Sequence, residues 1–408
     1  MGNYKIREFY GKEQIPYKKL SAIMFRRGIE DLKDEAAYAE KLEEADSKRS
    51  EDFMRLGAFY DDVFYAAIES IPYIVRFDGH LCKMSGIGGV ISDFNAPVKG
   101  AMKEIYKEAF IRMRKKGQYI SHLFGFEENY YRQYGYDASC REMIWHIPIE
   151  KLRIMKEGII KPFDNSEKMK QEICTIREKF SADQNLYIQK SEKDWECFFE
   201  NRHAYTQKIL SFVHYSPEGV ADAFMSYSTS ANENRPQDMV TKELWFTNLS
   251  GLRGVLSYFA TQRAYCDYLK ITLPEHVDLS LITDSCGGWG KRNTYAENRH
   301  HGTTRIVDVE EILKIASYRG RGKICIRICD DIYAPWNNDC FTVEFGEKTT
   351  VTRGGTPDIE MNINAFSTGI IGKTDFENLL LLPEVKMLRD AAFDCVFYRK
   401  KLFMEEHF

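Results

Sequence analysis

The sequence lacks the features that mark several large classes of protein. No run in its 408 residues approaches the roughly 20 consecutive apolar residues of a membrane-spanning helix. The opening residues, MGNYKIREFYGKEQ, contain no apolar signal segment. Basic and acidic residues nearly balance, at 57 against 61, which gives no general argument for a nucleic-acid partner. We therefore expect a soluble, cytoplasmic protein with no membrane and no nucleic acid among its partners.

Recognisable metal and disulfide patterns are also missing. The ten cysteines include no CxxC pair, and no HExxH spacing occurs. Cys325 and Cys329 lie in KICIRIC, where alternation places them on one face of a strand and isoleucines on the other. His300 and His301 lie in a polar segment, NRHHG, which favours a solvated loop over a metal site. We expect free cysteines and no bound metal.

A strand–helix–strand pattern over residues 87–136 is the strongest local signal in the chain. Its central helix is predicted from apolar residues at helical spacing, namely Met102, Ile105, Tyr106, Ala109, Phe110 and Met113. Gly117 is suited to end this helix, and the apolar run Tyr119–Phe124 predicts a second strand. A helix that joins two neighbouring strands in this way favours a parallel pair.

The start of this helix is a candidate phosphate site. The first turn of a helix has unpaired backbone N–H groups and the positive end of the helix dipole, and both attract phosphate. Lys99, Gly100 and Ala101 lie where that turn should begin, and small residues let a pyrophosphate approach the backbone. A glycine between a strand and a helix is also ordinary turn chemistry, so both interpretations stay open.

The length predicts about two to three domains. Three sections can be marked, over residues 1–150, 151–290 and 291–408. The second section repeats the pattern of the first without its glycine turn, with helices predicted over Asp194–Val213 and Leu252–Leu269. Asp284–Thr304, rich in glycine and mixed charge, is predicted to be a linker. The third section has an apolar-faced sheet with helices, suited to packing on the other domains or to enclosing a hydrophobic ligand.

Several stretches together closely resemble one known family, the Eis (enhanced intracellular survival) acetyltransferases of the GNAT superfamily. In the first section these are RFDGHLCKMSGIGGV, the glycine that opens the helix, and ENYYRQYGYD. In the third section they are RIVDVEEIL, APWNNDCFTVEF and PDIEMNINAFSTGIIG. The resemblance covers nearly the whole chain. It implies an α+β fold of two tandem GNAT-like domains followed by a sterol-carrier-protein-like domain, with acetyl-CoA bound only in the first.

The resemblance assigns acetyl-CoA contacts to two segments of the first domain. The cofactor strand and the phosphate turn would contribute Val90, Ile91, Ser92, Val98, Lys99, Gly100 and Ala101. The turn departs from the family pattern at Pro97 and Val98, where arginines are frequent, and at Met102, which replaces a second small residue. Charge-assisted contacts to phosphate are about twice as strong as neutral ones, so this departure predicts weaker acetyl-CoA binding.

The resemblance also implies two residues that move protons. Tyr131, four residues before the glycine of Gly135-Tyr136, corresponds to a general acid, since a phenol can protonate a leaving thiolate. A plain core role is the alternative, because other tyrosines crowd the same turn. Phe408 corresponds to a C-terminal aromatic residue whose α-carboxylate acts as the base. The alternatives there are a frayed terminus and His407 as the base.

These observations together predict an activity. We expect an acetyl-CoA-dependent N-acetyltransferase that acts by direct transfer on a primary amine of a cationic, aminoglycoside- or polyamine-like substrate. The resemblance implies a homo-oligomer, in this family a hexamer. The alternative is a catalytically impaired acyl-CoA-binding or scaffolding protein of GNAT fold, which Pro97 and Val98 favour and Tyr131 argues against. A lipid carrier, the third interpretation, rests on the last domain alone.

Overall fold

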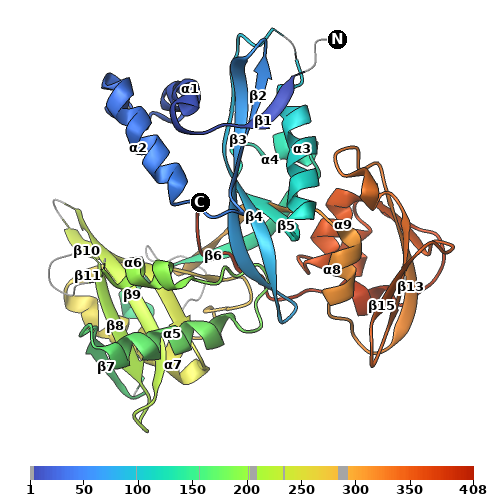
Figure 1. The fold of residues 1–408 in the computed structure, drawn as a ribbon. Coiled ribbons are helices and arrows are strands. Elements are labelled where there is room, and N and C mark those ends of the chain that lie inside the picture. Colours follow the sequence, from blue (N-terminus) through green and yellow to red (C-terminus); the bar gives the residue numbers. More distant parts are fainter. Residues whose placement is uncertain are drawn as a thin grey trace. The chain divides into compact units, whose positions relative to one another are not determined.

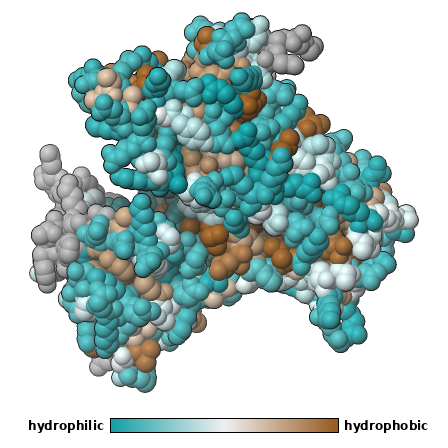
Figure 2. All heavy atoms as spheres, in the orientation of Figure 1, coloured by the Kyte–Doolittle hydropathy of each residue, from teal (hydrophilic) through white to brown (hydrophobic). Residues whose placement is uncertain are grey.

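A computed structural model describes residues 4–97, 99–155, 157–200, 202, 209–232, 235–283 and 293–408, without the side chains of 231–237. The chain divides into two compact units (Figure 1). Unit 1 comprises Met1–Ser139, Gly302–Lys400 and Glu405–Phe408, and unit 2 comprises Cys140–His301 and Lys401–Met404. No helix within the described ranges is long and apolar enough to cross a membrane. The face drawn in Figure 2 is mostly hydrophilic, with hydrophobic residues in a few small patches.

The N-terminal part of unit 1 is built on a mixed sheet. Its strands are β1 (Lys5–Glu8), β2 (Met54–Tyr60), β3 (Val63–Phe77), β4 (His80–Ser92) and β5 (Gln118–Leu123). β1 to β4 pair antiparallel in sequence order, and β5 then pairs parallel to β4. The last residues of β12 (Tyr295–Ile306) pair antiparallel with β5. β3 and β4 form one long hairpin, turned at Asp78 and Gly79, which both have positive φ.

The predicted crossover helix is confirmed as α3 (Ala101–Lys115), which joins the parallel strands β4 and β5. All the apolar residues from which it was predicted are buried, and they pack on β2 and β3. Gly100 precedes the helix with φ 104°, and Gly117 follows it with φ 71°. Both backbone conformations are ones that glycine adopts without strain. The helix therefore begins and ends where its sequence predicts.

Helices cover the two faces of this sheet (Figure 1). α3 covers one face, and α1 (Ile15–Phe25) packs against β3 and β4 on the other, with Tyr17 in a cluster that includes Phe64 and Ile91. α2 (Glu35–Ser47) packs on the short 3-10 helix η1 (Gly11–Gln14), and a second short helix, η2 (Asp31–Lys33), joins α1 to α2. The aromatic turn forms a short helix, α4 (Glu128–Arg132), which follows β5.

The C-terminal part of unit 1 has its own five-stranded sheet, in the order β15-β14-β13-β16-β17. Its elements are α8 (Val309–Ile315), β13 (Gly322–Cys329), η5 (Pro335–Asn337), β14 (Cys340–Phe345), β15 (Thr350–Arg353), β16 (Ile359–Asn362), α9 (Ile363–Ile370), α10 (Phe376–Leu379), β17 (Lys386–Met387) and α11 (Phe393–Val396). Cys325 and Cys329 are both free and lie in β13 among buried isoleucines, as predicted.

Unit 2 repeats the arrangement of the first sheet. Its elements are most of β6 (Asp137–Pro148), η3 (Ile149–Lys151), β7 (Ile159–Pro162), α5 (Glu167–Ser181), α6 (Glu192–Glu200), β8 (Leu210–Tyr215), β9 (Ala221–Asn232), β10 (Arg235–Phe246), α7 (Leu249–Thr261), η4 (Gln262–Ala264), β11 (Cys266–Pro274) and the start of β12. β10 and β11 are parallel and joined by α7, just as β4 and β5 are joined by α3.

Three sequence-based predictions in this region are wrong in their extent. The helix predicted to reach Val213 ends at Glu200 in α6, and β8 begins at Leu210. The helix predicted to reach Leu269 ends at Thr261, and strand β11 takes over at Cys266. The predicted linker includes most of β12, while its Gly-Gly-Trp-Gly stretch lies outside the described residues. Polar composition suggested a loop there, but backbone pairing with β5 does not depend on polar or apolar side chains.

Candidate active site

A cavity of about 420 Å³ lies in unit 1 where β4 and β5 separate. The parallel pairing of the two strands extends from Lys83 opposite Gln118 to Ile87 opposite Leu123, whereas β4 continues to Ser92. Beyond Ile87, β4 is paired with β3 alone among the described strands. The backbone groups on its other edge are therefore available to a ligand, which can lie along the strand as an added strand would.

The cavity brings together three of the residues predicted from the sequence: Val90, Tyr131 and Phe408. Ile91 instead points into the core on the α1 side, and Ser92 is half-buried at the end of β4. Three further predicted residues lie at the start of α3. Lys99 is exposed, Gly100 is the N-cap residue, and Ala101 is the first residue of the helix. Val98 lies outside the described residues. No atom of the described residues lies within 4 Å of the place where a Cβ on Gly100 would be.

Two glycines of the SGIGGV segment shape the cavity. A Cβ on Gly86 would lie 2.5 Å from a ring carbon of Phe408, so only glycine leaves room for that ring. Gly89 has φ 56°, and a Cβ there would overlap the hydroxyl of Tyr17. These positions explain why the strand carries glycines: they admit aromatic side chains close to the backbone.

Tyr131 lies in α4 and is only 3% exposed. Burial raises the pKa of its hydroxyl above the usual tyrosine value, and the neighbouring Tyr130 adds to the shift. Among the described residues its hydroxyl has no hydrogen-bond partner in the structure. A tyrosine in this state stays protonated at neutral pH, which is the state a proton donor requires.

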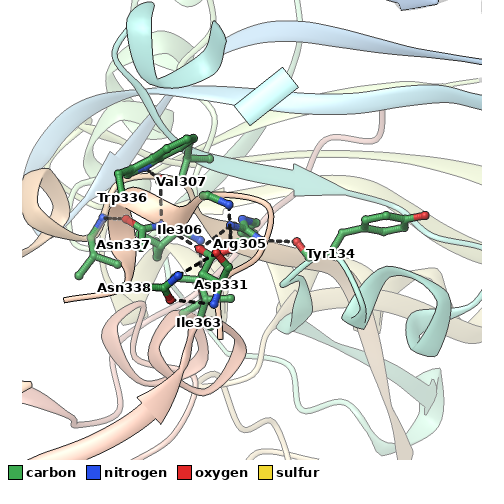
Figure 3. Close-up of polar contacts among 12 residues, drawn as sticks. Tyr134, Arg305, Ile306, Val307, Asp331, Trp336, Asn337, Asn338 and Ile363 are labelled. Carbon is green, nitrogen blue, oxygen red and sulfur yellow. Dashed lines mark hydrogen bonds and ion pairs between the residues drawn. The ribbon is translucent and has the colours of Figure 1, made fainter. Parts of the chain in front are cut away.

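Arg305 and its partner Asp331 hold the turn that carries Tyr131, which Arg305 contacts at Tyr134 (Figure 3). Arg305 in β12 is fully buried and donates one hydrogen bond to the carbonyl of Tyr134. Its other terminal nitrogen lies 2.7 Å from both carboxylate oxygens of Asp331, and its guanidinium stacks 4.1 Å over Phe110 of α3. Arg305 thus connects the turn, the crossover helix and the C-terminal domain.

A second side chain of the C-terminal domain holds the same turn. The amide nitrogen of Asn364 donates to the carbonyls of Arg132, at 3.1 Å, and Tyr136, at 2.9 Å. Within the turn, the backbone N–H groups of Tyr134 and Tyr136 both bond to the carbonyl of Tyr131. Because its backbone is bonded on both sides, the turn presents the Tyr131 side chain in one position.

The ring of Phe408 is packed among aromatic residues in unit 1. Its centroid lies 4.8 Å from that of Tyr73, 5.0 Å from that of Phe124 and 6.0 Å from that of His122. His407 is exposed and packs its ring against Phe124. The end of the described chain is therefore held at the cavity by an aromatic cluster.

Glu69 in β3 also lines the cavity, and it was not singled out from the sequence. It is paired with the fully buried Arg55, whose Nε lies 2.8 Å from Glu69 Oε1. A second nitrogen of Arg55 lies 3.2 Å from Asp46 in α2. The available sequence signal was an acidic residue inside the apolar run of β3, but nothing local indicates which residue neutralises it.

The corresponding helix end in unit 2 is closed by the chain itself. Ser250 and Arg253, in the first turns of α7, bind the carboxylate of Glu157 at 2.6 and 2.8 Å. These contacts hold the pKa of Glu157 below its usual value, with the hydrogen bond from Ser250 as the main cause. The side chain of Asn248 caps the helix. A carboxylate thus lies at the start of this helix, where an anion such as phosphate would bind.

Comparison with known proteins identifies two domain families in the chain. Residues 24–139 match the acetyltransferase (GNAT) domain family, and residues 309–404 match the sterol carrier protein domain family. No curated protein matches the sequence. Among the described residues no cluster of side chains is placed to hold a metal ion.

Solved structures resemble the whole chain, with 100% of each chain aligned. They include a probable N-acyltransferase from Enterococcus faecalis V583 (TM-score 0.79, 19% identity) and a GCN5-related N-acetyltransferase from Anabaena variabilis (TM-score 0.80, 14% identity). Eis1 from Mycobacterium abscessus is similar too (TM-score 0.78, 16% identity). At these identities the likeness concerns the fold.

The chain thus carries an acetyltransferase (GNAT) domain near its start and a sterol carrier protein domain near its end, and the GNAT fold uses acetyl-CoA. Over its whole length the chain shares its fold with Eis1 from Mycobacterium abscessus. The predicted α+β fold class is confirmed, as are the predicted GNAT domain and sterol-carrier-like domain.

Proposed function

We propose that the chain transfers the acetyl group of acetyl-CoA directly to a primary amine of a cationic, aminoglycoside- or polyamine-like molecule. One observation carries the proposal. A single cavity collects the unpaired edge of β4 at Val90, the buried hydroxyl-bearing Tyr131 and the anchored Phe408. A strand edge, a proton donor and a terminal residue suited to be a base are the parts that direct acyl transfer requires.

In this proposal acetyl-CoA lies along β4 and ends at α3. Backbone groups of Val90, Ile91 and Ser92 bind the pantetheine arm, and the pyrophosphate meets the segment Val98–Ala101. The open space at Gly100 and the free N–H groups of a 15-residue helix fit an anion there. Lys99 supplies one positive charge, while Pro97 supplies none.

The chemical step moves two protons. The amine nitrogen forms a bond to the thioester carbonyl carbon, while backbone N–H groups of β4 polarise the carbonyl oxygen. The C–S bond then breaks, and Tyr131 gives its proton to the leaving thiolate. The acceptor nitrogen, an ammonium in water, first gives one proton to the carboxylate of Phe408 and so becomes nucleophilic; the proton that it loses after attack restores the hydroxyl of Tyr131. Aromatic contacts hold the ring of Phe408 at the cavity. Proximity to a bound cation favours the charged form of the Phe408 carboxylate.

Removal of one hydroxyl group tests the proposal. Tyr131→Phe should lower kcat by about 10²–10⁴, the usual span for a general acid, and should leave the affinity for acetyl-CoA nearly constant. Tyr130→Phe is the matched control, because Tyr130 neighbours the same ring. If Tyr130→Phe proved the damaging change, the proton donor would be assigned to the wrong tyrosine.

The absence of arginine at Pro97 and Val98 favours one other candidate, a protein that binds acyl-CoA without turnover. Calorimetric titration with acetyl-CoA, followed by assay of thiol release with a panel of amines, separates the two functions. Binding with thiol release supports the transferase, and binding without release for any amine supports the alternative. Arginine at either position should tighten binding if the missing charge limits affinity.

A further inference from the structure

The cavity contains a carboxylate to which the proposed mechanism assigns no role. Among the described residues that line it, Glu69 is the only one with an acidic side chain. Its side chain is 18% exposed, and it lies with Val90 and Tyr131 around the same space. A partly buried charge at this place is costly unless something binds it.

Glu69 is directed into the cavity by the strand. Successive residues of β3 alternate between the two faces of the sheet: Ala67 packs on the α1 side, Ile68 packs on the α3 side, and Glu69 returns to the α1 side opposite Gly88. The register shift at this place adds its extra residue to β4, at Gly89 and Val90. The neighbouring Gly89 keeps the space open, since a Cβ there would lie 3.3 Å from the Cγ of Glu69.

The carboxylate of Glu69 is held in place but keeps hydrogen-bond acceptor positions. Arg55 binds one oxygen, Oε1, at 2.8 Å. An ionised carboxylate has about four acceptor positions, so acceptor capacity remains. Arg55 is itself shared with Asp46, which is also paired with Arg49 at 3.2 Å. These contacts orient the carboxylate of Glu69, whose remaining acceptor positions are available to a ligand in the cavity.

Two basic residues also line the cavity, and they would suit an acceptor molecule with an acidic group. Lys18 in α1 is half-buried, and Arg27 is exposed. Burial lowers the pKa of Lys18, against the opposing pull of Glu69. An acceptor molecule with an acidic group would bind these cations, whereas an ammonium group would avoid them and bind Glu69.

We propose that Glu69 binds the ammonium group of the acceptor amine and so selects amines at this site. The assignment rests on the proposed function, because it needs an amine as acceptor. An ammonium group offers three donors to a carboxylate, and such charge-assisted bonds are about twice as strong as neutral ones. Glu69 is thus a residue that recognises substrate, in addition to the proton donor Tyr131.

The test is Glu69→Gln, which keeps the size of the side chain and an acceptor oxygen for Arg55 but removes the charge. With spermidine as the amine, KM should rise by about 10- to 100-fold, the scale of a charged hydrogen bond, while the Kd of acetyl-CoA stays constant. Calorimetric titration of spermidine into the protein without acetyl-CoA should show the same loss. An unchanged KM and Kd for spermidine would overturn the assignment.

Asp46→Asn is the matched control. It removes the other carboxylate bound to Arg55 and disturbs the same buried guanidinium, but Asp46 does not line the cavity. KM for spermidine should stay within about twofold, and thermal unfolding of both variants should show similar destabilisation. An equal rise of KM in both variants would assign the effect to Arg55 and overturn the role of Glu69.

Lys18→Met distinguishes the two kinds of acceptor. If the ammonium binds Glu69, removal of a nearby positive charge should lower KM for spermidine or leave it unchanged. A raised KM in Lys18→Met, with no effect of Glu69→Gln, would show recognition of an acidic group instead. If the unchanged protein released no thiol with any amine, the proposed function would fail, whereas the spermidine titration would still decide the role of Glu69.

Discussion

The buried ion pair between Arg305 and Asp331 allows a quantitative prediction for Asp331→Asn. Both side chains are almost fully enclosed, at 0% and 1% exposed, and each carboxylate oxygen lies 2.7 Å from the same guanidinium nitrogen. Asparagine has nearly the same size and can still accept from the N–H of Ala334, which lies 3.0 Å from Oδ1. The change removes the counter-charge, and it also replaces Oδ2, which accepts from Nδ2 of Asn337 at 3.0 Å, by an amide nitrogen that cannot accept.

Arginine keeps its charge in proteins, so the substitution leaves a buried cation without a partner. Breaking a buried pair in this way costs about 3–5 kcal/mol. Total stability is typically about 5–15 kcal/mol, so the loss should be large for this unit. Arg305→Met in the same background removes the orphaned charge, and the double variant should be more stable than the sum of the single changes implies.

Urea unfolding measures the change in the free energy of unfolding, and hydrogen exchange of residues 331–338 measures local opening. Glu344→Gln is the control, because the Lys323–Glu344 pair lies in the same domain but is 64% and 57% exposed. Exposed pairs contribute about 0–1 kcal/mol. If Asp331→Asn cost no more than Glu344→Gln, the argument from burial would be wrong.

Three further predictions concern the site. Gly100→Val should weaken acetyl-CoA binding by more than about tenfold in calorimetric titration, because a branched residue is strained at φ 104°, whereas Lys99→Ala should cost about 1–2 kcal/mol. Residues appended after Phe408 should lower kcat by moving its carboxylate; full activity would leave His407 as the base. In a pH–rate profile, kcat should not fall near the ordinary tyrosine pKa of about 10, because the pKa of Tyr131 is raised and the acid must stay protonated; a fall there would contradict its burial.

Local sequence patterns predicted the central part of the fold. The apolar spacing from Met102 to Met113 specified α3, and the flanking glycines specified its ends, because helix periodicity and turn conformation depend on residues a few positions apart. The motifs of the aromatic turn and of the C-terminal section indicated which domains are present. The extents of α6 and α7 were overestimated, because an apolar run can continue from a helix into a strand.

Residues that meet across the fold could not be predicted in this way. Glu69 faces the cavity because the alternation of β3 places it on the face that α1 covers, and its partners Arg55 and Asp46 precede it by 14 and 23 residues. Arg305 directly follows the segment that was predicted to be a linker, yet it holds the Tyr134 carbonyl 171 residues earlier in the chain. The sequence alone determined which helix, turn and domains this protein has, because those signals are local. Only the tertiary structure decided which charges meet and which of them face the cavity, because packing and long-range strand pairing bring them together.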